Sequence, residues 1–441
     1  MAFYRRCCIL LLFLLAGGLL LLLYAPLAAG KPRRATNIDT SGISRSRFFA
    51  TTVTGLEKVL ANELRAIGAK KVDVARNGVY FDGDTKLVLS SVMNLRTALR
   101  VMEVVTEASQ VVSKDDLYSM VSSVDWTEYL SSPLATLKCD TTLGRDVGRD
   151  LTHTHFCSLT VKNAIVDQFR DSVGTRPSVD LEDPELPLLL YLHRGSATLY
   201  RIWSGDSSLH KRGYRGMVHK AALRETTAAA LLYLSNWPHG AAKNETFVDP
   251  MCGSGTLAIE AALISANVAP GLIRYGNSED KNKNAPRCTR WPGVSEESWD
   301  DVWYEAKAKD QRDELQKESS PSIFVNDVEI SCIELAIKAA ASAGVHKLID
   351  FSCRDISEYN PKLNDRRDLS HIITNPPWDL RIGGAEEAWS KLGEFAYSYT
   401  PDSIWALTGN PKVTEFTDMN VKKSVKFKAS SVNMDFINFD M

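Results

Sequence analysis

The sequence lacks the patterns that mark several common protein classes. Its eight cysteines include no C-x-x-C pair, and two of them, Cys7 and Cys8, lie in an N-terminal leader, so neither a zinc site nor a disulfide framework is indicated. The 52 Lys and Arg residues nearly balance the 54 Asp and Glu residues, for a formal net charge of -2. A nucleic-acid partner therefore has to bind at a local basic patch. No repeat or low-complexity tract follows the leader, and with 44% hydrophobic and 24% charged residues the composition is that of an ordinary globular chain.

What the sequence does contain begins with a long apolar leader. The run over residues 9–29 carries no charge and is long enough for a membrane span of about 20 residues. It also has the character of a signal peptide with small residues at Ala28, Ala29 and Gly30, and the basic, Ser/Thr-containing stretch after it is typical of transit peptides. We expect residues 1–47 to deliver the chain to an organelle, with a plastid as the first candidate. Membrane association through residues 9–29 is the open alternative.

Strand and helix patterns divide the rest of the 441-residue chain into three parts. Residues 48–115 and 116–208 each combine short strands with an amphipathic helix, which predicts two small α+β units. In residues 209–441, apolar strands alternate with helices. This alternation predicts an α/β fold with a parallel sheet that helices cover on both faces.

The third part contains a glycine turn. The stretch "TFVDPMCGSGTLAIEAALISA" predicts an apolar strand that ends at Asp249, a tight turn with Gly253 and Gly255, and an Ala-rich helix. Glycines let a ligand approach the backbone, and a helix N-terminus offers unpaired N–H groups. The pattern also fits a dinucleotide fingerprint, but that site expects an acidic residue about 20 positions later. Residues 261–278 contain no Asp or Glu, so the pattern favours a different ligand.

Polar groups also follow the next three predicted strands. The strand in "SIFVNDVE" ends at Asp327, whose carboxylate can accept both hydroxyls of a ribose, and Asp355 follows the next strand. The last strand is stopped by "NPPW" at residues 375–378, because proline lacks a backbone donor and fixes φ. The carboxyl ends of the strands of a doubly wound sheet face one crevice, so all of these groups can line one cleft.

The stretch "NPPW" matches the motif [DNS]-P-P-[YFW], and the region resembles S-adenosylmethionine-dependent amino methyltransferases. The resemblance implies S-adenosyl-L-methionine as cofactor, with its methionine part at Asp249, Pro250, Gly253 and Gly255. It implies that the ribose binds at Asp327 and the adenine amine at Asp355. The target amine would lie in a clamp formed by Asn375, the carbonyl of Pro376, Pro377 and Trp378. In this clamp Trp378 would stack on the base.

Four longer stretches make the resemblance more specific: "TVKNAIVDQFRD", "SGDSSLHKRGYR", "HKAALRETTAAALLYLSNW" and "FVDPMCGSGTLAIEAALISANVAPGL". They are similar to the THUMP-containing guanine-N2 methyltransferases of bacterial large-subunit ribosomal RNA. That family implies a ferredoxin-like unit at residues 48–115, a THUMP-like RNA-binding module at 116–208 and a Rossmann-like methyltransferase domain at 209–441. The sequence departs from the family at "NPPWDLRI", where the family has a tyrosine followed by Gly-Glu-Arg. Trp378 can still stack, but it has no phenolic hydroxyl.

A basic stretch between the second and third parts suggests an RNA contact. Residues 210–224 contain five Lys and Arg residues and no acidic residue. Phosphates and stacked bases would both find partners there, and a solvated linker is the alternative interpretation. The residues predicted to bind RNA are Lys211, Arg212, Tyr214, Arg215 and Lys220.

Two further clusters favour structural interpretations. His153, His155 and Cys157 lack the further ligand pair of a zinc site, so buried or capping roles are favoured and we expect no metal. Core packing or a loop lid is favoured over base stacking for the tryptophans of "CTRWPGVSEESWDDVWYEA", which are Trp291, Trp299 and Trp303.

Two other classes of function stay open from the sequence. The chain can be an RNA-binding ribosome-assembly factor without turnover, which the altered "WDLRI" would explain. It can also be an amino methyltransferase of another planar group, such as a tRNA guanosine, a DNA adenine or a protein glutamine. The THUMP-like half argues against DNA and protein substrates.

Overall fold

The structure, a computed structural model, describes residues 37–38, 44–130, 132, 134–216, 223–276, 284–318, 322–363, 369–379, 384–429 and 431–441. Most of the predicted leader and Lys220 lie outside the described residues. Within these ranges, no helix combines the length and the apolar character that crossing a bilayer requires. Targeting to an organelle and the membrane anchor therefore stay predictions.

The first two units share one sheet. Its nine strands follow the order β3-β4-β2-β5-β9-β8-β6-β7, with β1 paired to β2. Strands β5 and β9 pair along most of their length and so join the two units. The strands are β1 (Asn37–Ile38), β2 (Ser44–Thr51), β3 (Lys70–Ala75), β4 (Gly78–Gly83), β5 (Arg100–Ser109), β6 (Thr136–Leu143), β7 (Ser178–Val179), β8 (Leu186–His193) and β9 (Ser196–Ile202).

Helices cover this sheet in both units. Helices α1 (Glu57–Ala66) and α2 (Thr85–Asn94) belong to the first unit, and α3 (Lys114–Ser122) and α4 (Thr154–Val173) to the second. Helix α3 begins with a complete capping box, in which Ser113 and Asp116 bond to each other's backbone. Single turns of 3-10 helix lie at η1 (Trp126–Glu128) and η2 (Arg149–Leu151).

The third part of the chain forms the predicted parallel sheet, extended by a hairpin. Its order is β12-β11-β10-β13-β14-β16-β15, in which the first five strands are parallel and β16 pairs antiparallel with β14 and β15. The hairpin was not predicted. The strands are β10 (Phe247–Asp249), β11 (Ile323–Asp327), β12 (Ile349–Cys353), β13 (His371–Thr374), β14 (Ser403–Thr408), β15 (Asn420–Ala429) and β16 (Val432–Asp440).

Helices cover both faces of this sheet, as predicted. Neighbouring strand residues such as Phe247 and Val248, or Ile373 and Ile372, belong to two different hydrophobic clusters, one on each face. The α-helices are α5 (Glu225–Leu234), α6 (Trp237–Ala242), α7 (Thr256–Ser265), α8 (Pro270–Tyr275), α9 (Glu296–Ala308), α10 (Arg312–Glu318), α11 (Ile330–Ser342) and α12 (Ala385–Tyr399). The 3-10 turns are η3 (Arg287–Arg290), η4 (His346–Leu348), η5 (Ile356–Glu358) and η6 (Pro411–Phe416).

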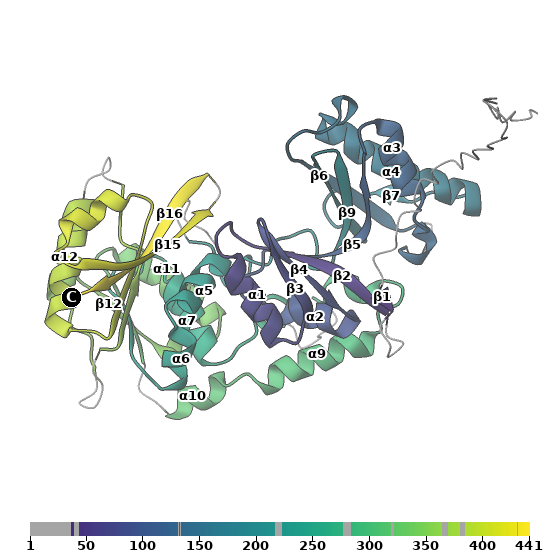
Figure 1. The fold of residues 1–441 in the computed structure, drawn as a ribbon. Coiled ribbons are helices and arrows are strands. Elements are labelled where there is room, and N and C mark those ends of the chain that lie inside the picture. The colour runs from purple at the N-terminus through teal and green to yellow at the C-terminus, as the bar shows by residue number, and fades with distance from the viewer. Residues whose placement is uncertain are drawn as a thin grey trace, which may run out of the picture.

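The three parts lie in a row, with the first unit in the middle (Figure 1). The long helix α9 leaves the third part and runs along the first unit, where it packs against α2 (Figure 1). Trp291 and Trp299, beside and within α9, are buried in the core. Core packing is therefore confirmed for these two tryptophans, and Trp303 packs half-buried against the same core.

Of the buried or capping roles predicted around Cys157, the structure supports only the buried cysteine. Cys157 is buried inside α4, whereas His153 and His155 are exposed, and His153 directly precedes the helix without a side-chain hydrogen bond to its N-terminus. In the described ranges, no three His, Cys, Asp or Glu side chains lie close enough together to hold a metal ion.

Candidate active site

A cavity of about 690 Å³ lies where the carboxyl ends of β10, β11, β12 and β13 meet. The chain leaves β10 toward β11 on one side and returns to β13 on the other, so β10 and β13 flank the switch point of the sheet. Ligands of doubly wound sheets bind in the crevice at this point. The volume is within the range of small-molecule sites, about 300–1,000 Å³.

The glycine turn forms one wall of the cavity. Gly253 has φ +53°, and no atom lies within 4 Å of the place where a Cβ would stand, so the backbone here is open to a ligand. Its N–H donates to Oδ2 of Asp327 at 2.8 Å, while Oδ1 of Asp327 accepts from the N–H of Glu329 at 3.0 Å. The Asp327 carboxylate thus joins the ends of β10 and β11 and faces the cavity.

Gly255 has a different role from the one predicted. It does not appear among the described residues that line the cavity. A Cβ at this position would stand 2.8 Å from the Cβ of Ala336. The glycine therefore allows α7 to pack closely against α11. It precedes the first residue of α7 with a φ of +72°, a conformation that glycine adopts without strain.

Asn326 connects three of the loops, and sequence reasoning missed it. The side chain is 1% exposed. Its Nδ2 donates to the carbonyls of Pro250 and Arg354 at 3.2 and 2.9 Å, and its Oδ1 accepts from the N–H of Arg354 at 3.1 Å. A buried amide inside an apolar strand needs such partners, and this was the signal in "IFVND" that could have identified it.

Two carboxylates in the cavity differ in their environment. Asp249 is 1% exposed, and burial raises its pKa to about 7. Asp355 is more exposed, and its hydrogen bonds with Lys391 and Ser357 lower its pKa to about 2. Lys391 Nζ lies 2.8 Å from Oδ2 of Asp355. No sequence signal identified Lys391, because it lies on α12, far along the chain from Asp355.

The residues of "NPPW" do not all face the cavity. Asn375 and Pro377 line it, and Oδ1 of Asn375 is buried without a hydrogen-bond partner among the residues that the structure describes. Pro376 is buried behind them, and the Pro377 carbonyl accepts from the indole N–H of Trp389 at 2.9 Å. A buried acceptor without a partner is costly, so Asn375 Oδ1 is suited to receive a donor from a ligand.

Trp378 lies outside the set of residues that line the cavity. Its ring packs against Gly409, where a Cβ would stand 2.7 Å from the ring, and against the hydrophobic clusters on both faces of the sheet. The indole therefore helps to hold the "NPPW" loop against the end of β14. Stacking of Trp378 on a base, like the Pro376 carbonyl contact, stays a prediction.

Comparisons with known proteins agree with this arrangement. A family model described as "RMKL-like, methyltransferase domain" matches residues 212–437, about half of the chain. The chain belongs to this methyltransferase family. Models of the RlmL ferredoxin-like domain and of the THUMP domain match residues 47–102 and 112–201. The predicted fold class and the resemblance to THUMP-containing methyltransferases are therefore confirmed, and the three parts are called the ferredoxin-like unit, the THUMP unit and the methyltransferase domain below.

Individual relatives cover most of the chain. "Ribosomal RNA large subunit methyltransferase K/L" of Syntrophotalea carbinolica is 35% identical over 90% of this chain and 53% of its own length. The chain spans about half the length of the curated relatives it matches. Two solved structures, one of a possible methylase from Clostridium difficile 630 and one of a methyltransferase complexed with SAH, are each 26% identical with a TM-score of 0.76. Each match covers 90% of this chain and 98% of the other.

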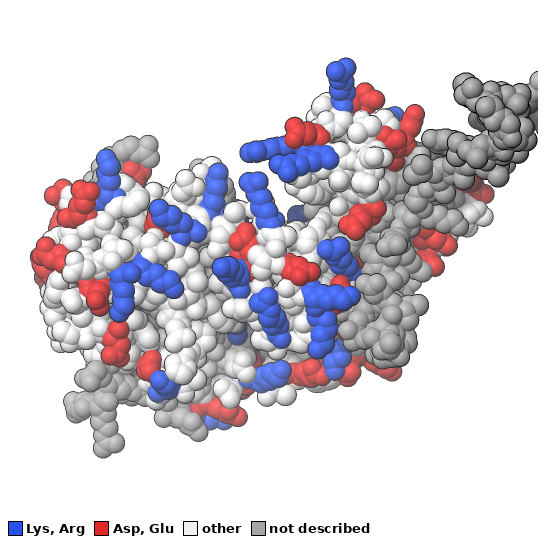
Figure 2. Space-filling view, in the orientation of Figure 1, with Lys and Arg blue, Asp and Glu red and all other residues white. Residues whose placement is uncertain are grey.

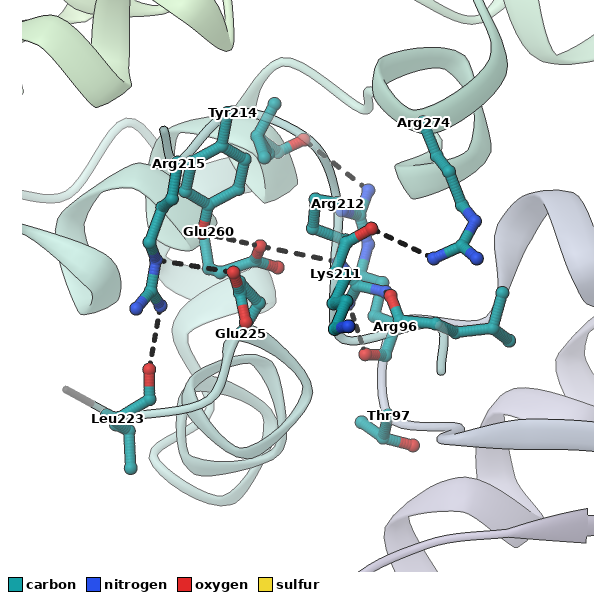
Figure 3. Close-up of polar contacts among 12 residues, drawn as sticks. Arg96, Thr97, Lys211, Arg212, Tyr214, Arg215, Leu223, Glu225, Glu260 and Arg274 are labelled. Atoms are coloured by element: carbon teal, nitrogen blue, oxygen red, sulfur yellow. Dashed lines mark hydrogen bonds and ion pairs between the residues drawn. The ribbon is translucent and has the colours of Figure 1, made fainter. Parts of the chain in front are cut away.

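The structure corrects the predicted RNA-binding patch of this family member. Arg212 and Tyr214 are each 1% exposed, and the Arg215 side chain is 6% exposed. Figure 3 shows their side chains directed into the protein, toward Glu260 and Glu225. These three residues therefore cannot contact RNA in this fold. Lys211 is exposed, and its part in RNA binding stays a prediction.

The buried side chains form a network between the ferredoxin-like unit and the methyltransferase domain. Arg212 donates to the backbone carbonyls of Leu209 and Arg96 and lies 3.6 Å from Glu260. Tyr214 donates to Oε1 of Glu260 at 3.1 Å (Figure 3). Buried charges require such partners, so this basic stretch holds the two domains together.

A second ion pair completes this network. Arg215 lies 3.2 Å from Glu225, which opens α5, and donates to the Leu223 carbonyl at 2.7 Å. The sequence "HKRGYR" contains the cations, but their acidic partners come from α5 and α7.

Proposed function

We propose that the protein is an S-adenosyl-L-methionine-dependent RNA methyltransferase that modifies the exocyclic N2 amine of a guanosine in large-subunit ribosomal RNA. The names of its relatives, which are large-subunit ribosomal RNA methyltransferases, support the substrate class. The structural neighbour that was solved with SAH supports the cofactor. The THUMP match supports an RNA substrate over a DNA adenine or a protein glutamine.

The cavity residues fit the cofactor. The open backbone at Gly253 can face its methionine part, and the Asp327 carboxylate can accept from the ribose hydroxyls. Asp355 lies at the cavity wall as an ionised acceptor for the adenine amine, since its pKa is lowered to about 2. When bound, the cofactor supplies a methyl group on a positively charged sulfonium.

The observation that carries the proposal is Oδ1 of Asn375, which has no hydrogen-bond partner among the described residues and belongs to the same cavity as Gly253 and Asp327. An exocyclic base amine is a poor nucleophile because its lone pair is delocalised into the ring. An acceptor for one of its hydrogens orients the nitrogen and lets its lone pair point at the methyl group. Positioning of this kind and fixed charge can supply most of the catalysis.

The target base has to leave its stack to reach Asn375. Enzymes that act on base atoms extrude the nucleotide into a pocket. In our proposal, the ferredoxin-like and THUMP units hold the surrounding RNA, while the loop at residues 375–378 receives the base.

Methyl transfer to ribosomal RNA lacking the modification tests the proposal. The wild-type protein should transfer a labelled methyl group, and mass spectrometry of nucleosides should identify N2-methylguanosine. Asn375→Ala should abolish transfer but keep cofactor affinity within about twofold, because the acceptor meets the amine and not the cofactor. Asn360→Ala, at an exposed position of the methyltransferase domain outside the cavity lining, is the matched control.

The outcomes separate the alternatives. Cofactor and RNA binding without transfer by the wild-type protein would favour the assembly-factor hypothesis. Methyl transfer to tRNA but not to ribosomal RNA would show that the proposed substrate is wrong. Near-normal turnover by Asn375→Ala would refute the proposed role of Asn375 in holding the amine.

A further inference from the structure

The hairpin of β15 and β16 presents lysines at the edge of the methyltransferase sheet. Lys422, Lys423, Lys426 and Lys428 lie on β15, and all four are exposed. Lys422 lies 3.6 Å from Asp440 at the end of β16. Lysines often protect an edge strand from pairing with another chain. Their surroundings decide whether these lysines also bind a ligand.

Two of these lysines share one face of the hairpin. Successive side chains of a strand point to opposite faces. Phe427 is buried and belongs to the core, so Lys426 and Lys428 on either side of it point to the other face. Asp435 lies across the hairpin from Lys426, and its Oδ1 accepts from the Ser424 hydroxyl at 2.8 Å.

A cleft of about 540 Å³ lies beside the hairpin, between two domains, and both the lysines and the buried residues Phe427 and Met434 line it. The hairpin contributes Lys426, Lys428 and Asp435, and the ferredoxin-like unit contributes Thr54 and Gly55. The Lys428 N–H donates to the Thr54 carbonyl at 2.8 Å. A Cβ at Gly55 would stand 2.7 Å from the carbonyl oxygen of Lys426, so the two backbones are in close contact. Both sides of the cleft are therefore fixed by backbone contacts.

Gly409 separates the cleft from the loop that carries the amine clamp. Gly409 lines the cleft, and the ring of Trp378 packs against Gly409. Trp378 directly follows Pro377, which lines the cofactor cavity. One indole ring thus lies between the lysine-bearing cleft and the site at Asn375.

We propose that Lys426 and Lys428 bind phosphates of a single-stranded segment of the RNA substrate, and that the cleft leads this segment past Trp378 to Asn375. The described residues that line the cleft include two cations and one carboxylate, that of Asp435, and this balance suits an anionic chain. In the view of Figure 2, Lys and Arg side chains lie over the hairpin and over the neighbouring ferredoxin-like unit. This inference rests on the proposed function, because RNA is taken as the substrate.

The test uses the full chain with Lys426→Glu and Lys428→Glu combined. These glutamates keep charged side chains at the strand edge, so edge protection is retained while phosphate binding is lost. A neutral pair, Lys426→Gln with Lys428→Gln, avoids repulsion from Asp435. The matched control is Lys338→Glu with Lys347→Glu, two exposed lysines beside β11 and β12 at the opposite edge of the sheet.

Binding to a fluorescent single-stranded oligouridylate is measured across salt concentrations, together with cofactor affinity and methyl transfer. Loss of two phosphate contacts should reduce the salt slope of log K by about 1.4. It should weaken RNA binding on the order of tenfold at about 0.15 M salt. We expect this for the glutamine pair and a larger loss for the glutamate pair, with methylation reduced at low RNA concentration and cofactor affinity unchanged.

The control pair should bind RNA and turn over like the wild type. If the hairpin variants match the control pair in salt slope and affinity while the wild type methylates RNA, the inference is overturned and the lysines only protect the edge. If the wild type binds RNA through these lysines but transfers no methyl group, the proposed function fails while the inference holds.

Discussion

Replacing Asp327 with alanine perturbs the centre of the cofactor cavity. Its carboxylate accepts from the N–H groups of Gly253 at 2.8 Å and Glu329 at 3.0 Å, and it faces the cavity beside the glycine turn. Asp327→Ala therefore removes the expected ribose acceptor and releases the turn from the end of β11. Both effects weaken cofactor binding.

The expected size follows from the hydrogen bonds lost. A hydrogen bond to a charged group contributes about 1.5–3 kcal/mol. Loss of one such bond to the ribose corresponds to a rise in cofactor Kd of about 10- to 150-fold. Release of the Gly253 N–H adds to this loss, because the turn then has to be ordered on binding.

Titration calorimetry with S-adenosylmethionine measures this change, with thermal unfolding as the check on folding. Glu334→Ala, an exposed acidic position on α11, removes a carboxylate near the site without touching the cavity and should bind like the wild type. A folded Asp327→Ala protein whose Kd changes less than twofold would refute the ribose assignment.

Four further predictions concern other parts of the molecule. Arg212→Ala should lower the free energy of unfolding in urea by about 3–5 kcal/mol, because it leaves Glu260 buried without its cation. An equally stable variant that binds RNA with a reduced salt slope would restore the interpretation of Arg212 as an RNA contact. Burial raises the pKa of Asp249 from 3.8 to about 7, so this group makes stability fall as pH rises through that window, by up to ~1.4 kcal/mol per pH unit. Asp249→Asn should remove this slope in unfolding curves recorded across the window, and an unchanged slope would contradict the assignment. Trp378→Tyr should keep most methyl transfer. Trp378→Ala should raise the KM for RNA about 5- to 150-fold if the ring stacks on the base, since such stacking contributes about 1–3 kcal/mol. Equal KM values for both variants would leave only the packing role. A fluorescent fusion of residues 1–47 should enter an organelle, which microscopy checks, and a purely membrane-bound signal would favour the anchor.

The sequence predicted the fold and most of the cavity for one physical reason. In a parallel sheet, the residues after successive strands meet at the same edge. Once the apolar strands were recognised, the polar groups that follow them were expected to lie together. The cavity does bring together Asp249, Pro250, Gly253, Asp327, Asp355, Asn375 and Pro377.

Local pattern could not predict the contacts made with distant parts of the chain. A run of Lys and Arg without acids indicates a solvated or RNA-binding surface, yet Arg212 and Arg215 are buried because Glu260 and Glu225 approach from other elements. The same limit applies to Lys391, which pairs with Asp355 from α12. The orientation of Trp378 was also decided by a distant residue, Gly409.

The sequence by itself therefore determined which groups stand at the ends of strands, because strand periodicity and proline or glycine breaks are local properties. Only the tertiary structure decided which charges are buried and which remain exposed. Burial of a charge depends on a partner that can lie anywhere in the chain. The hairpin lysines show the converse, since β15 lies at the sheet edge and leaves Lys426 and Lys428 exposed beside a cleft that two domains form together.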